Sequence, residues 1–448
     1  MGPHFLDQLF SPRAVAVFGA SPHADSVGGR VFTNLRESGF AGPLYAVNPK
    51  PDSIADAPCY PDIAAIGEAV DLAVIATPAA TVPGIVRACG EHGVRAAIVI
   101  SAGFSEDPGR GAELQKSLLE NARPYQMRIL GPNCLGLIRP VAGLNATFSN
   151  NTAAAGRLAL VSQSGALCTA ILDWADASDI GFSAVVSVGD AADVGFGDVL
   201  DYLAQDPETR SILLYVEGIR SARRFMSGLR VAARMKPVIV VKAGRQAEGS
   251  RAAVTHSGAL VGADDVFDAA LQRAGAVRAT TIQQLFAAAT LLSTPQRVRG
   301  NRIAIVTNGG GPGVMATDRA VDLGVQLAEL SATTLARLDA ALPAAWSRGN
   351  PLDVLGDASA ERYRNAVQAC LEDPAVDGVL VMLTPQAMTD PTACAEAVVE
   401  ARAGHNKPVL ACWMGEQQVQ QANRHFAQHQ LPSFTSPESS VEAFAYLS

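Results

Sequence analysis

The stretch Leu158-Ala159-Leu160-Val161-Ser162-Gln163-Ser164-Gly165 carries the pattern that decides the fold. Four apolar residues predict a short buried strand, and two serines and a glycine predict a tight turn. The following residues, Ala166–Ala175, repeat their apolar side chains with the period of a helix. An apolar strand that passes through a turn into a helix is typical of a parallel sheet covered on both faces.

The same strand, turn and helix unit recurs along the whole chain, which indicates a doubly wound α/β pattern repeated three times. The other apolar runs that predict strands are Ala14–Phe18, Leu44–Val47, Leu72–Ala76, Ala96–Ile100, Arg128–Leu130, Ala184–Val188, Ile212–Val216, Val238–Val241, Arg302–Val306, Gly378–Leu383 and Val409–Trp413. Two breaks interrupt the pattern, a turn-rich stretch at Arg139–Gly156 and a polar one at Ser293–Asn301. They predict three domains, at residues 1–140, 141–295 and 298–448.

Composition narrows the class of protein. Of the 448 residues, 48% are hydrophobic and 17% are charged, which indicates globular domains and excludes a disordered chain. The net charge of −8 and the lack of a basic run argue against a surface that binds nucleic acid. Seven scattered cysteines without metal-like spacing indicate reduced thiols, and no apolar run reaches the ~20 residues of a membrane span. We therefore expect a cytoplasmic protein with no metal site of its own.

Three of the strand-ending turns have the composition of phosphate-binding loops. The first contains Gly19, Ala20 and Ser21 and is followed by Gly28-Gly29, after which a helix is expected to start near Val31. The second is Ser162-Gln163-Ser164-Gly165, and the third contains Gly309, Gly310 and Gly311. Ordinary helix capping explains the first two turns as well, because serine is a preferred cap residue. Four glycines within residues 309–313 exceed what capping requires, so phosphate or nucleotide binding is favoured there.

The first turn does not form a complete dinucleotide-binding fingerprint. The full GxGxxG spacing is missing, and so is the acidic residue expected at the end of the second strand. That position has Val47-Asn48-Pro49-Lys50, in which Lys50 can bind a phosphate. The first domain therefore suits a nucleotide with an extra phosphate better than NAD, and a dehydrogenase is disfavoured.

His256 is the candidate for covalent phosphoryl transfer. It lies between small residues in Thr255-His256-Ser257-Gly258, and an imidazole nitrogen can carry a phosphoryl group. Glu217 follows another predicted strand, where its carboxylate can hydrogen-bond one ring nitrogen and fix the tautomer. A histidine in an ordinary loop and a solvated glutamate are the plainer alternatives. Cys134 has no basic neighbour in sequence, so a nucleophilic role is not expected.

Together these residues resemble one family, the NDP-forming acyl-CoA synthetases, and in particular their α-subunit part. The similarity extends over essentially all 448 residues. The proteins that the chain resembles include ADP-forming acetate–CoA ligases and the N-terminal part of Pat-type lysine acetyltransferases. The motifs that carry it are VFGAS (17–21), VNPK (47–50), ISAGFSE (100–106), GPNCLG (131–136), SQSG (162–165), YVEGI (215–219), THSGAL (255–260) and NPLD (350–353).

The resemblance implies a CoA-binding Rossmann-like domain followed by two flavodoxin-like doubly wound domains. It implies that His256 is phosphorylated, that Glu217 positions it and that residues 162–165 hold the phosphate. The residues that the resemblance assigns to CoA are Gly19, Ala20, Ser21, Lys50, Ser101, Ala102 and Gly103. It places Asn133 at the floor of the active site, and Gly309, Gly310 and Gly311 in a second phosphate-binding loop whose role is less defined.

The implied reaction converts an acyl-CoA, ADP and phosphate into a carboxylate, ATP and CoA, with acetate as the expected acid. The sequence contains no recognisable ATP-grasp domain, so we expect ADP or ATP with Mg²⁺ to bind a partner subunit or a fused domain, within an oligomer. An alternative is that the chain is the CoA-sensing module of a Pat-type lysine acetyltransferase. In some of those relatives the histidine is lost, so its presence as His256 favours the enzyme.

Overall fold

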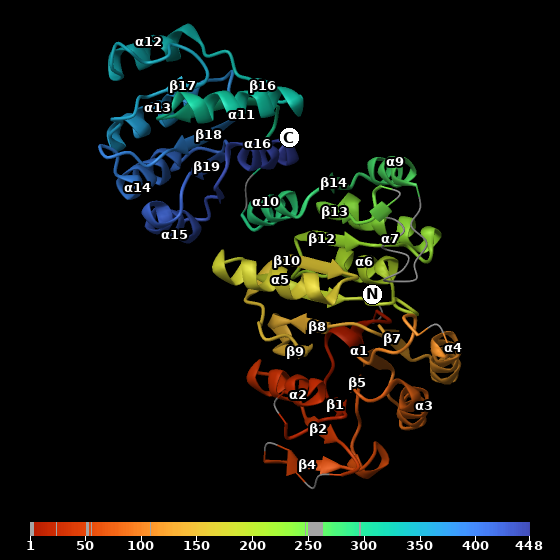
Figure 1. Ribbon diagram of the computed structural model, residues 1–448. Helices are drawn as coiled ribbons and strands as arrows, with labels where there is room; N and C mark the ends of the chain where they lie inside the picture. Colours follow the sequence, from red (N-terminus) through yellow and green to blue (C-terminus); the bar gives the residue numbers. More distant parts are fainter. Residues whose placement is uncertain are drawn as a thin grey trace. The chain divides into compact units, whose positions relative to one another are not determined.

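The computed structural model describes residues 4–23, 25–50, 53–54, 56–107, 109–246, 248–249, 263–294 and 297–448. The chain divides into two compact units, Met1–Thr280 and Thr281–Ser448 (Figure 1). The first unit contains two sheets and the second unit contains one. The bounds of the three domains expected from the sequence stay predictions.

The first sheet has the strand order β3-β4-β2-β1-β5-β6-β7, and all its pairs are parallel except β3 with β4. Its strands are β1 (Val15–Phe18), β2 (Leu44–Val47), β3 (Ser53–Ile54), β4 (Ala57–Tyr60), β5 (Leu72–Ile75), β6 (Ala96–Val99) and β7 (Arg128–Leu130). Its helices are α1 (Asp7–Phe10), α2 (Val27–Glu37), α3 (Val82–Glu91) and α4 (Gly111–Ala122).

The second sheet has the order β14-β13-β12-β10-β11-β8-β9. Its strands are β8 (Gly136–Arg139), β9 (Leu144–Thr147), β10 (Ala155–Ser162), β11 (Phe182–Ser187), β12 (Ser211–Val216), β13 (Val238–Lys242) and β14 (Val277–Ala279). Helices α5 (Gly165–Ala177), α6 (Phe196–Gln205), α7 (Ala222–Met235) and α9 (Asp264–Ala274) accompany it. The pairs β8–β9 and β8–β11 are antiparallel, so this sheet is mixed.

The second unit has one sheet of order β16-β15-β18-β19-β20, with β17 paired to β15. The strands are β15 (Arg302–Thr307), β16 (Gln326–Leu327), β17 (Leu352–Asp353), β18 (Gly378–Leu383), β19 (Val409–Trp413) and β20 (Ser433–Phe434). The helices are α10 (Ile282–Leu292), α11 (Gly310–Asp322), α12 (Ala332–Ala341), α13 (Ala360–Glu372), α14 (Pro391–Arg402), α15 (Gln420–Gln428) and α16 (Pro437–Leu447).

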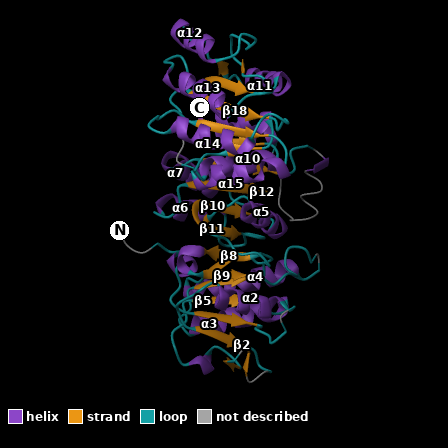
Figure 2. Ribbon diagram, turned by 90° about the vertical axis from the view of Figure 1, so that its left-hand side faces the viewer, coloured by secondary structure: helices purple, strands orange, loops and turns teal. Residues whose placement is uncertain are grey.

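Strand β1 is apolar at every position and β15 is apolar from Ile303 to Val306, because both faces of each sheet are covered by helices (Figure 2). In β1, Val15 and Val17 belong to one core while Ala16 and Phe18 belong to the core on the opposite face. Successive residues of a strand point to opposite faces, so this division follows directly from the strand geometry. The predicted α/β architecture with buried parallel strands is confirmed, and the edge β8–β9 adds an antiparallel element to it.

Each sheet has a point at which the chain reverses the direction in which strands are added. Strand β1 lies between β2 and β5, β10 lies between β11 and β12, and β15 lies between β16 and β18. In open α/β sheets, the crevice at the carboxyl ends of two such strands is the usual ligand-binding position. All three glycine- or serine-rich turns singled out in the sequence follow β1, β10 and β15 directly.

Two local expectations were wrong. The stretch Arg139–Gly156, expected to be irregular, contains β9 and the ends of β8 and β10. The signal was hidden because β9 buries two polar residues, Asn145 and Thr147, which hydrogen-bond each other at 2.6 Å. The helix after the first glycine turn was expected to start near Val31, but α2 begins at Val27 because the Ser26 side chain caps it.

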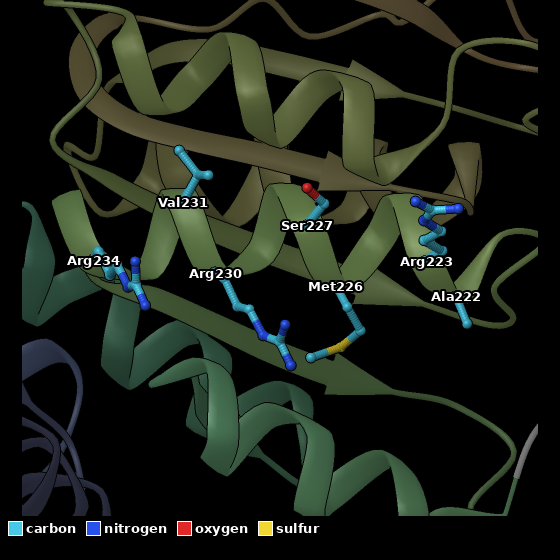
Figure 3. A pocket seen from close by; sticks show the side chains of 7 residues that line it. All are labelled: Ala222, Arg223, Met226, Ser227, Arg230, Val231 and Arg234. Atoms are coloured by element: carbon cyan, nitrogen blue, oxygen red, sulfur yellow. The ribbon is translucent and has the colours of Figure 1, made fainter.

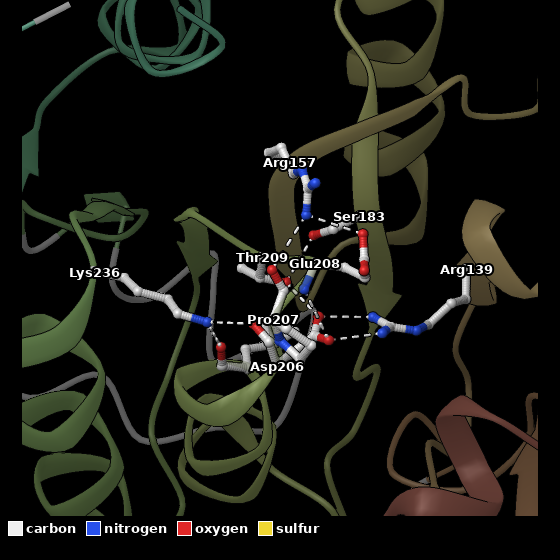
Figure 4. Close-up of polar contacts among 9 residues, drawn as sticks. Arg139, Arg157, Ser183, Asp206, Pro207, Glu208, Thr209 and Lys236 are labelled. Carbon is white, nitrogen blue, oxygen red and sulfur yellow. Dashed lines mark hydrogen bonds and ion pairs between the residues drawn. The ribbon is translucent and has the colours of Figure 1, made fainter. Parts of the chain in front are cut away.

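A buried ion pair joins the end of β8 to the residue that follows α6 (Figure 4). Arg139 at the end of β8 donates two hydrogen bonds, of 2.9 and 2.8 Å, to the carboxylate of Asp206 after α6. Thr209 donates a further bond to that carboxylate, and Lys236 donates to the Asp206 carbonyl oxygen. Burial alone would raise the pKa of Asp206, but the bonds from Arg139 and Thr209 outweigh it and lower the pKa.

Candidate functional site

The turn after β10 presents the N-terminus of a 13-residue helix at the switch point of the second sheet. Ser164 caps α5 by accepting a hydrogen bond from the Leu167 amide at 3.3 Å. Ser162 accepts a bond from the Ser164 amide at 3.0 Å and donates one to the Ser164 carbonyl at 2.9 Å. Ser164 therefore acts as the helix cap and Ser162 closes the turn before it, and the helix dipole directed at this turn also favours an anion.

Gln163 connects this turn to the neighbouring strand. Its side-chain oxygen accepts hydrogen bonds from the backbone amides of Glu217, at 2.6 Å, and Gly218, at 2.9 Å. Its own amide donates to the Tyr215 carbonyl oxygen at 3.2 Å. Glu217, with 9% of its surface exposed, thus lies directly beside the predicted phosphate loop. The structure brings Ser162, Gln163, Ser164, Gly165 and Glu217 together.

His256 lies outside the described residues, so its contact with Glu217 remains a prediction. The described residues on either side of that segment are held near each other. Lys242 at the end of β13 and Asp264 at the start of α9 form an ion pair of 3.4 Å. Arg278 of β14 pairs with the same carboxylate at 2.6 Å.

The turns predicted to bind CoA follow strands of the first sheet. Gly19, Ala20 and Ser21 follow β1, and the side chain of Asn48, after β2, donates to the Ala20 carbonyl oxygen at 2.8 Å. Lys50 is exposed, and its backbone amide donates to the Asn48 side chain at 3.1 Å. A Cβ on Gly28 would lie 1.9 Å from the Gly19 carbonyl oxygen, so only glycine lets α2 approach this turn.

The third turn predicted to bind CoA, Ser101–Gly103, follows β6 and contacts the segment that leaves the first sheet. The Ser101 hydroxyl donates to the Thr77 carbonyl oxygen at 2.5 Å, beyond the end of β5. Asn133 has a left-handed backbone with φ of 55°, and its amide donates to the Ser101 carbonyl oxygen at 3.0 Å. Asn133 thus lies between the turn predicted to bind CoA and β8 of the second sheet, and its place at the floor of the active site stays a prediction.

The turn after β15 in the second unit repeats the hydrogen-bond geometry of the turn after β10. The Thr307 hydroxyl accepts from the Gly309 amide at 3.1 Å and donates to the Gly309 carbonyl at 2.9 Å, as Ser162 does with Ser164. Asn308 bonds both the amide and the carbonyl of Thr384, at the end of β18, at 2.8 Å. Gly309 precedes α11, and Gly310 and Gly311 form its first turn.

The sequence did not reveal that the side-chain amides of Gln163 and Asn308 bridge neighbouring strand ends. Asn308 and Thr384 were not identified, and Gln163 was assigned only to the phosphate loop. The signal that could have revealed them is the repeated pattern of a hydroxyl residue, an amide residue and a small residue directly after a strand, in Ser162-Gln163-Ser164 and Thr307-Asn308-Gly309.

A hollow on the exposed side of α7 is lined by Ala222, Arg223, Met226, Ser227, Arg230, Val231 and Arg234 (Figure 3). None of these is a predicted site residue.

All seven cysteines lie in described parts of the chain, and none forms a disulfide there. Burial raises the pKa of the Cys134 thiol, which fits the expectation that it is not a nucleophile. None of the described helices combines the length and apolar character that crossing a membrane requires.

Three family models match successive parts of the chain. They are a CoA binding domain at residues 13–140, a succinyl-CoA ligase-like flavodoxin domain at 155–292 and a ligase-CoA domain at 303–445. The chain is 38% identical to the alpha subunit of acetate–CoA ligase (ADP-forming) I of Pyrococcus furiosus, over 99% of this chain and 97% of the relative. The chain therefore belongs to the NDP-forming acyl-CoA synthetases, as an α-subunit-like member of the ADP-forming acetate–CoA ligases.

Two further relatives define its extent. It is 43% identical over 99% of its length to acetate–CoA ligase (ADP-forming) I of Archaeoglobus fulgidus, but spans only 63% of that longer protein. A solved dinucleotide-forming acetyl-coenzyme A synthetase 1 of Ca. Korarchaeum cryptofilum, in complex with phosphate and ADP, matches with a TM-score of 0.93 and 35% identity. That match covers 99% of this chain and 96% of the solved chain.

Proposed function

We propose that this chain is the acyl-CoA-binding and phosphohistidine-bearing part of an ADP-forming acyl-CoA synthetase, with acetyl-CoA as substrate. The observation that carries the proposal is the Gln163 bridge, which places Glu217 beside the N-terminus of α5. An anion-binding helix end and a carboxylate that can orient a histidine are the two parts that phosphoryl transfer through histidine requires.

The reaction runs in three displacements. A phosphate oxygen attacks the thioester carbonyl carbon, the carbon–sulfur bond breaks, and CoA leaves as its thiolate while an acyl phosphate forms. A ring nitrogen of His256 then attacks phosphorus, and the carboxylate leaves with the electrons of the broken phosphorus–oxygen bond. The terminal oxygen of ADP finally takes the phosphoryl group from His256, which gives ATP.

The residues divide between the two ligands. Gly19, Ala20 and Ser21, Lys50, and Ser101, Ala102 and Gly103 bind CoA in this proposal, and Asn133 shapes the floor beside the thioester. The turn Ser162–Gly165 holds phosphate, and the turn Gly309–Gly311 offers a second phosphate-binding loop on the other unit. The exposed cation of Lys50 and the 11-residue helix α2 after the first turn suit the anionic groups of CoA.

ADP, with Mg²⁺, binds an ATP-grasp partner chain or a fused domain, and the complete enzyme acts in the cytoplasm as an oligomer. Two observations support a partner. The Pyrococcus relative is named as an alpha subunit, and the Archaeoglobus relative is longer than this chain.

Reconstitution tests the proposal. The chain is assayed with acetyl-CoA, phosphate, ADP and Mg²⁺, alone and after addition of an ATP-grasp chain from a related enzyme. We expect release of CoA thiol and formation of ATP in equal amounts only when both chains are present. Absence of both products with a partner chain that is active in its own enzyme would contradict the proposal.

A further inference from the structure

The turn at residues 101–106 is held at three points. Ser101 is anchored to the Thr77 carbonyl, as described above. Within the turn, the carboxylate of Glu106 accepts the amides of Gly103, at 2.5 Å, and Phe104, at 3.2 Å. The third contact comes from the second sheet, because the amide of Ser105 donates to the carboxylate of Asp190 at 3.3 Å.

Asp190 belongs to the loop after β11, which is fastened to the segment between the two sheets. The Asp190 amide donates to the Pro132 carbonyl at 3.0 Å, and the Ala192 amide donates to the Gly131 carbonyl at 3.0 Å. Gly189 has φ of 51°, and a Cβ there would lie 2.4 Å from the Pro132 carbonyl oxygen. The two segments therefore pack backbone against backbone.

The same loop reaches the phosphate turn. The Val188 amide donates to the Ser162 carbonyl at 2.8 Å, and the Ser187 hydroxyl accepts from the Leu135 amide at 3.0 Å. Residues 187–190 thus contact the predicted phosphate loop at one end and the predicted CoA turn at the other. Asp190 is the residue of this loop whose side chain reaches the CoA turn.

Asp190 is 7% exposed. Burial raises the pKa of its carboxyl group, the hydrogen bond from the Ser105 amide opposes the rise, the nearby charge of Glu106 adds to it and that of Arg220 opposes it. A buried acid is costly unless its bonds compensate. An uncharged residue at this buried position would avoid that cost. The presence of an acid there therefore indicates a role for Asp190 beyond the stability of the loop.

We propose that Asp190 is a positioning residue that holds the CoA turn at residues 101–106 in register with the phosphate turn at residues 162–165. The inference rests on the proposed function, because it takes these two turns to bind CoA and phosphate. A misplacement of about 1 Å between reacting groups can lower the rate about a hundredfold, so a fixed distance between the turns matters.

Asp193 provides a matched control in the same loop. Its carboxylate also accepts a backbone amide of the first sheet, that of Ile129, at 2.9 Å, and pairs with Arg128 at 2.8 Å. It does not contact the CoA turn in the described structure. Asp193→Ala therefore loosens the loop without releasing Ser105.

The experiment measures acetyl-CoA and phosphate binding to the full chain by calorimetry, together with the melting temperature. For Asp190→Ala we expect the Kd for acetyl-CoA to rise about tenfold, which corresponds to about 1.4 kcal/mol, and the Kd for phosphate to stay within about twofold. Asp190→Asn keeps an oxygen acceptor and should restore most of the affinity. Asp193→Ala should lower the melting temperature and leave the acetyl-CoA Kd unchanged.

The outcomes separate the two proposals. If the wild-type chain does not bind acetyl-CoA, the proposed function fails and this inference fails with it. If the wild type binds and Asp190→Ala binds equally well, only this inference is overturned. An equal loss in Asp193→Ala would also overturn it, because general loosening would then explain the effect. If Asp190→Ala is not recovered folded, Asp190→Ser, whose short hydroxyl does not span the distance to Ser105, takes its place with the same expectations.

Discussion

Gln163 acts at the scale of a single residue, because one side-chain oxygen accepts two amides of the next strand end. A turn made only of serine and glycine would cap α5 but would not fix Glu217 and Gly218 beside it. The Gln163 side chain therefore fixes the backbone from which the Glu217 side chain extends, and the proposed chemistry of the turn depends on that position.

Gln163→Leu removes this acceptor and leaves two partly buried amides without it. We expect urea denaturation to show that the free energy of unfolding falls by about 2 kcal/mol, in line with the usual cost of unsatisfied buried groups. Gln163→Glu keeps the acceptor and adds a negative charge at the helix N-terminus. It should retain the stability and weaken phosphate binding, and equal phosphate affinity in Gln163→Glu and the wild type would contradict the assignment of this turn.

Lys50 is predicted to contact the extra phosphate of CoA. Lys50→Ala should raise the Kd for CoA about tenfold, the equivalent of a charge-assisted bond of about 1.4 kcal/mol, and change the Kd for dephospho-CoA little. Calorimetry with both ligands makes the comparison. Lys116→Ala, on the exposed surface of α4, serves as the control and should leave both Kd values unchanged. Unchanged discrimination between the ligands in Lys50→Ala would refute the contact.

At the scale of the elements, the sequence predicted nearly all of the central strands, because strands buried on both faces are apolar throughout. It also located the turns after β1, β10 and β15, since glycine and serine are concentrated there. It did not predict β9, whose polar residues Asn145 and Thr147 satisfy each other inside the protein. Alternation of apolar and polar residues cannot mark a strand that buries both kinds.

The candidate site could be predicted from the sequence only in part. Local patterns identify a turn, but they do not show which turns meet. The bridges from Gln163 to Glu217 and from Asp190 to Ser105 join residues 54 and 85 positions apart, and only the sheet topology brings them together. The helix start at Val27 was missed because the cap, Ser26, lies before the glycines that drew attention.

At the scale of the whole first unit, the buried pair of Arg139 and Asp206 matters because it ties the end of β8 to the end of α6. Arg139→Met leaves the Asp206 carboxylate buried without its partner, which costs about 3–5 kcal/mol in comparable cases. We expect that loss in urea denaturation near pH 7. The control is Arg157→Met, which breaks a half-exposed pair with Glu208 and should cost under about 1 kcal/mol.

The pH dependence follows from the lowered pKa of Asp206. The pair stabilises the fold fully above the unfolded pKa of about 3.9, and the contribution is lost as the pH falls through the lower folded value. The difference in stability between the wild type and Arg139→Met should therefore shrink below about pH 4. A difference that stays constant down to pH 2 would show that the ion pair is not its source.

The central claim for the whole molecule is that this chain carries out the first half of a phosphoryl transfer and holds the product on His256. The most direct measurement is incubation of the chain with acetyl-CoA and radiolabelled phosphate, beside His256→Ala and the surface control His92→Ala. We predict acid-labile, base-stable label on the wild type and on His92→Ala, and none on His256→Ala, which should still bind CoA. Equal label on His256→Ala, or no label on a wild-type chain that binds both ligands and has its ATP-grasp partner present, would contradict the account.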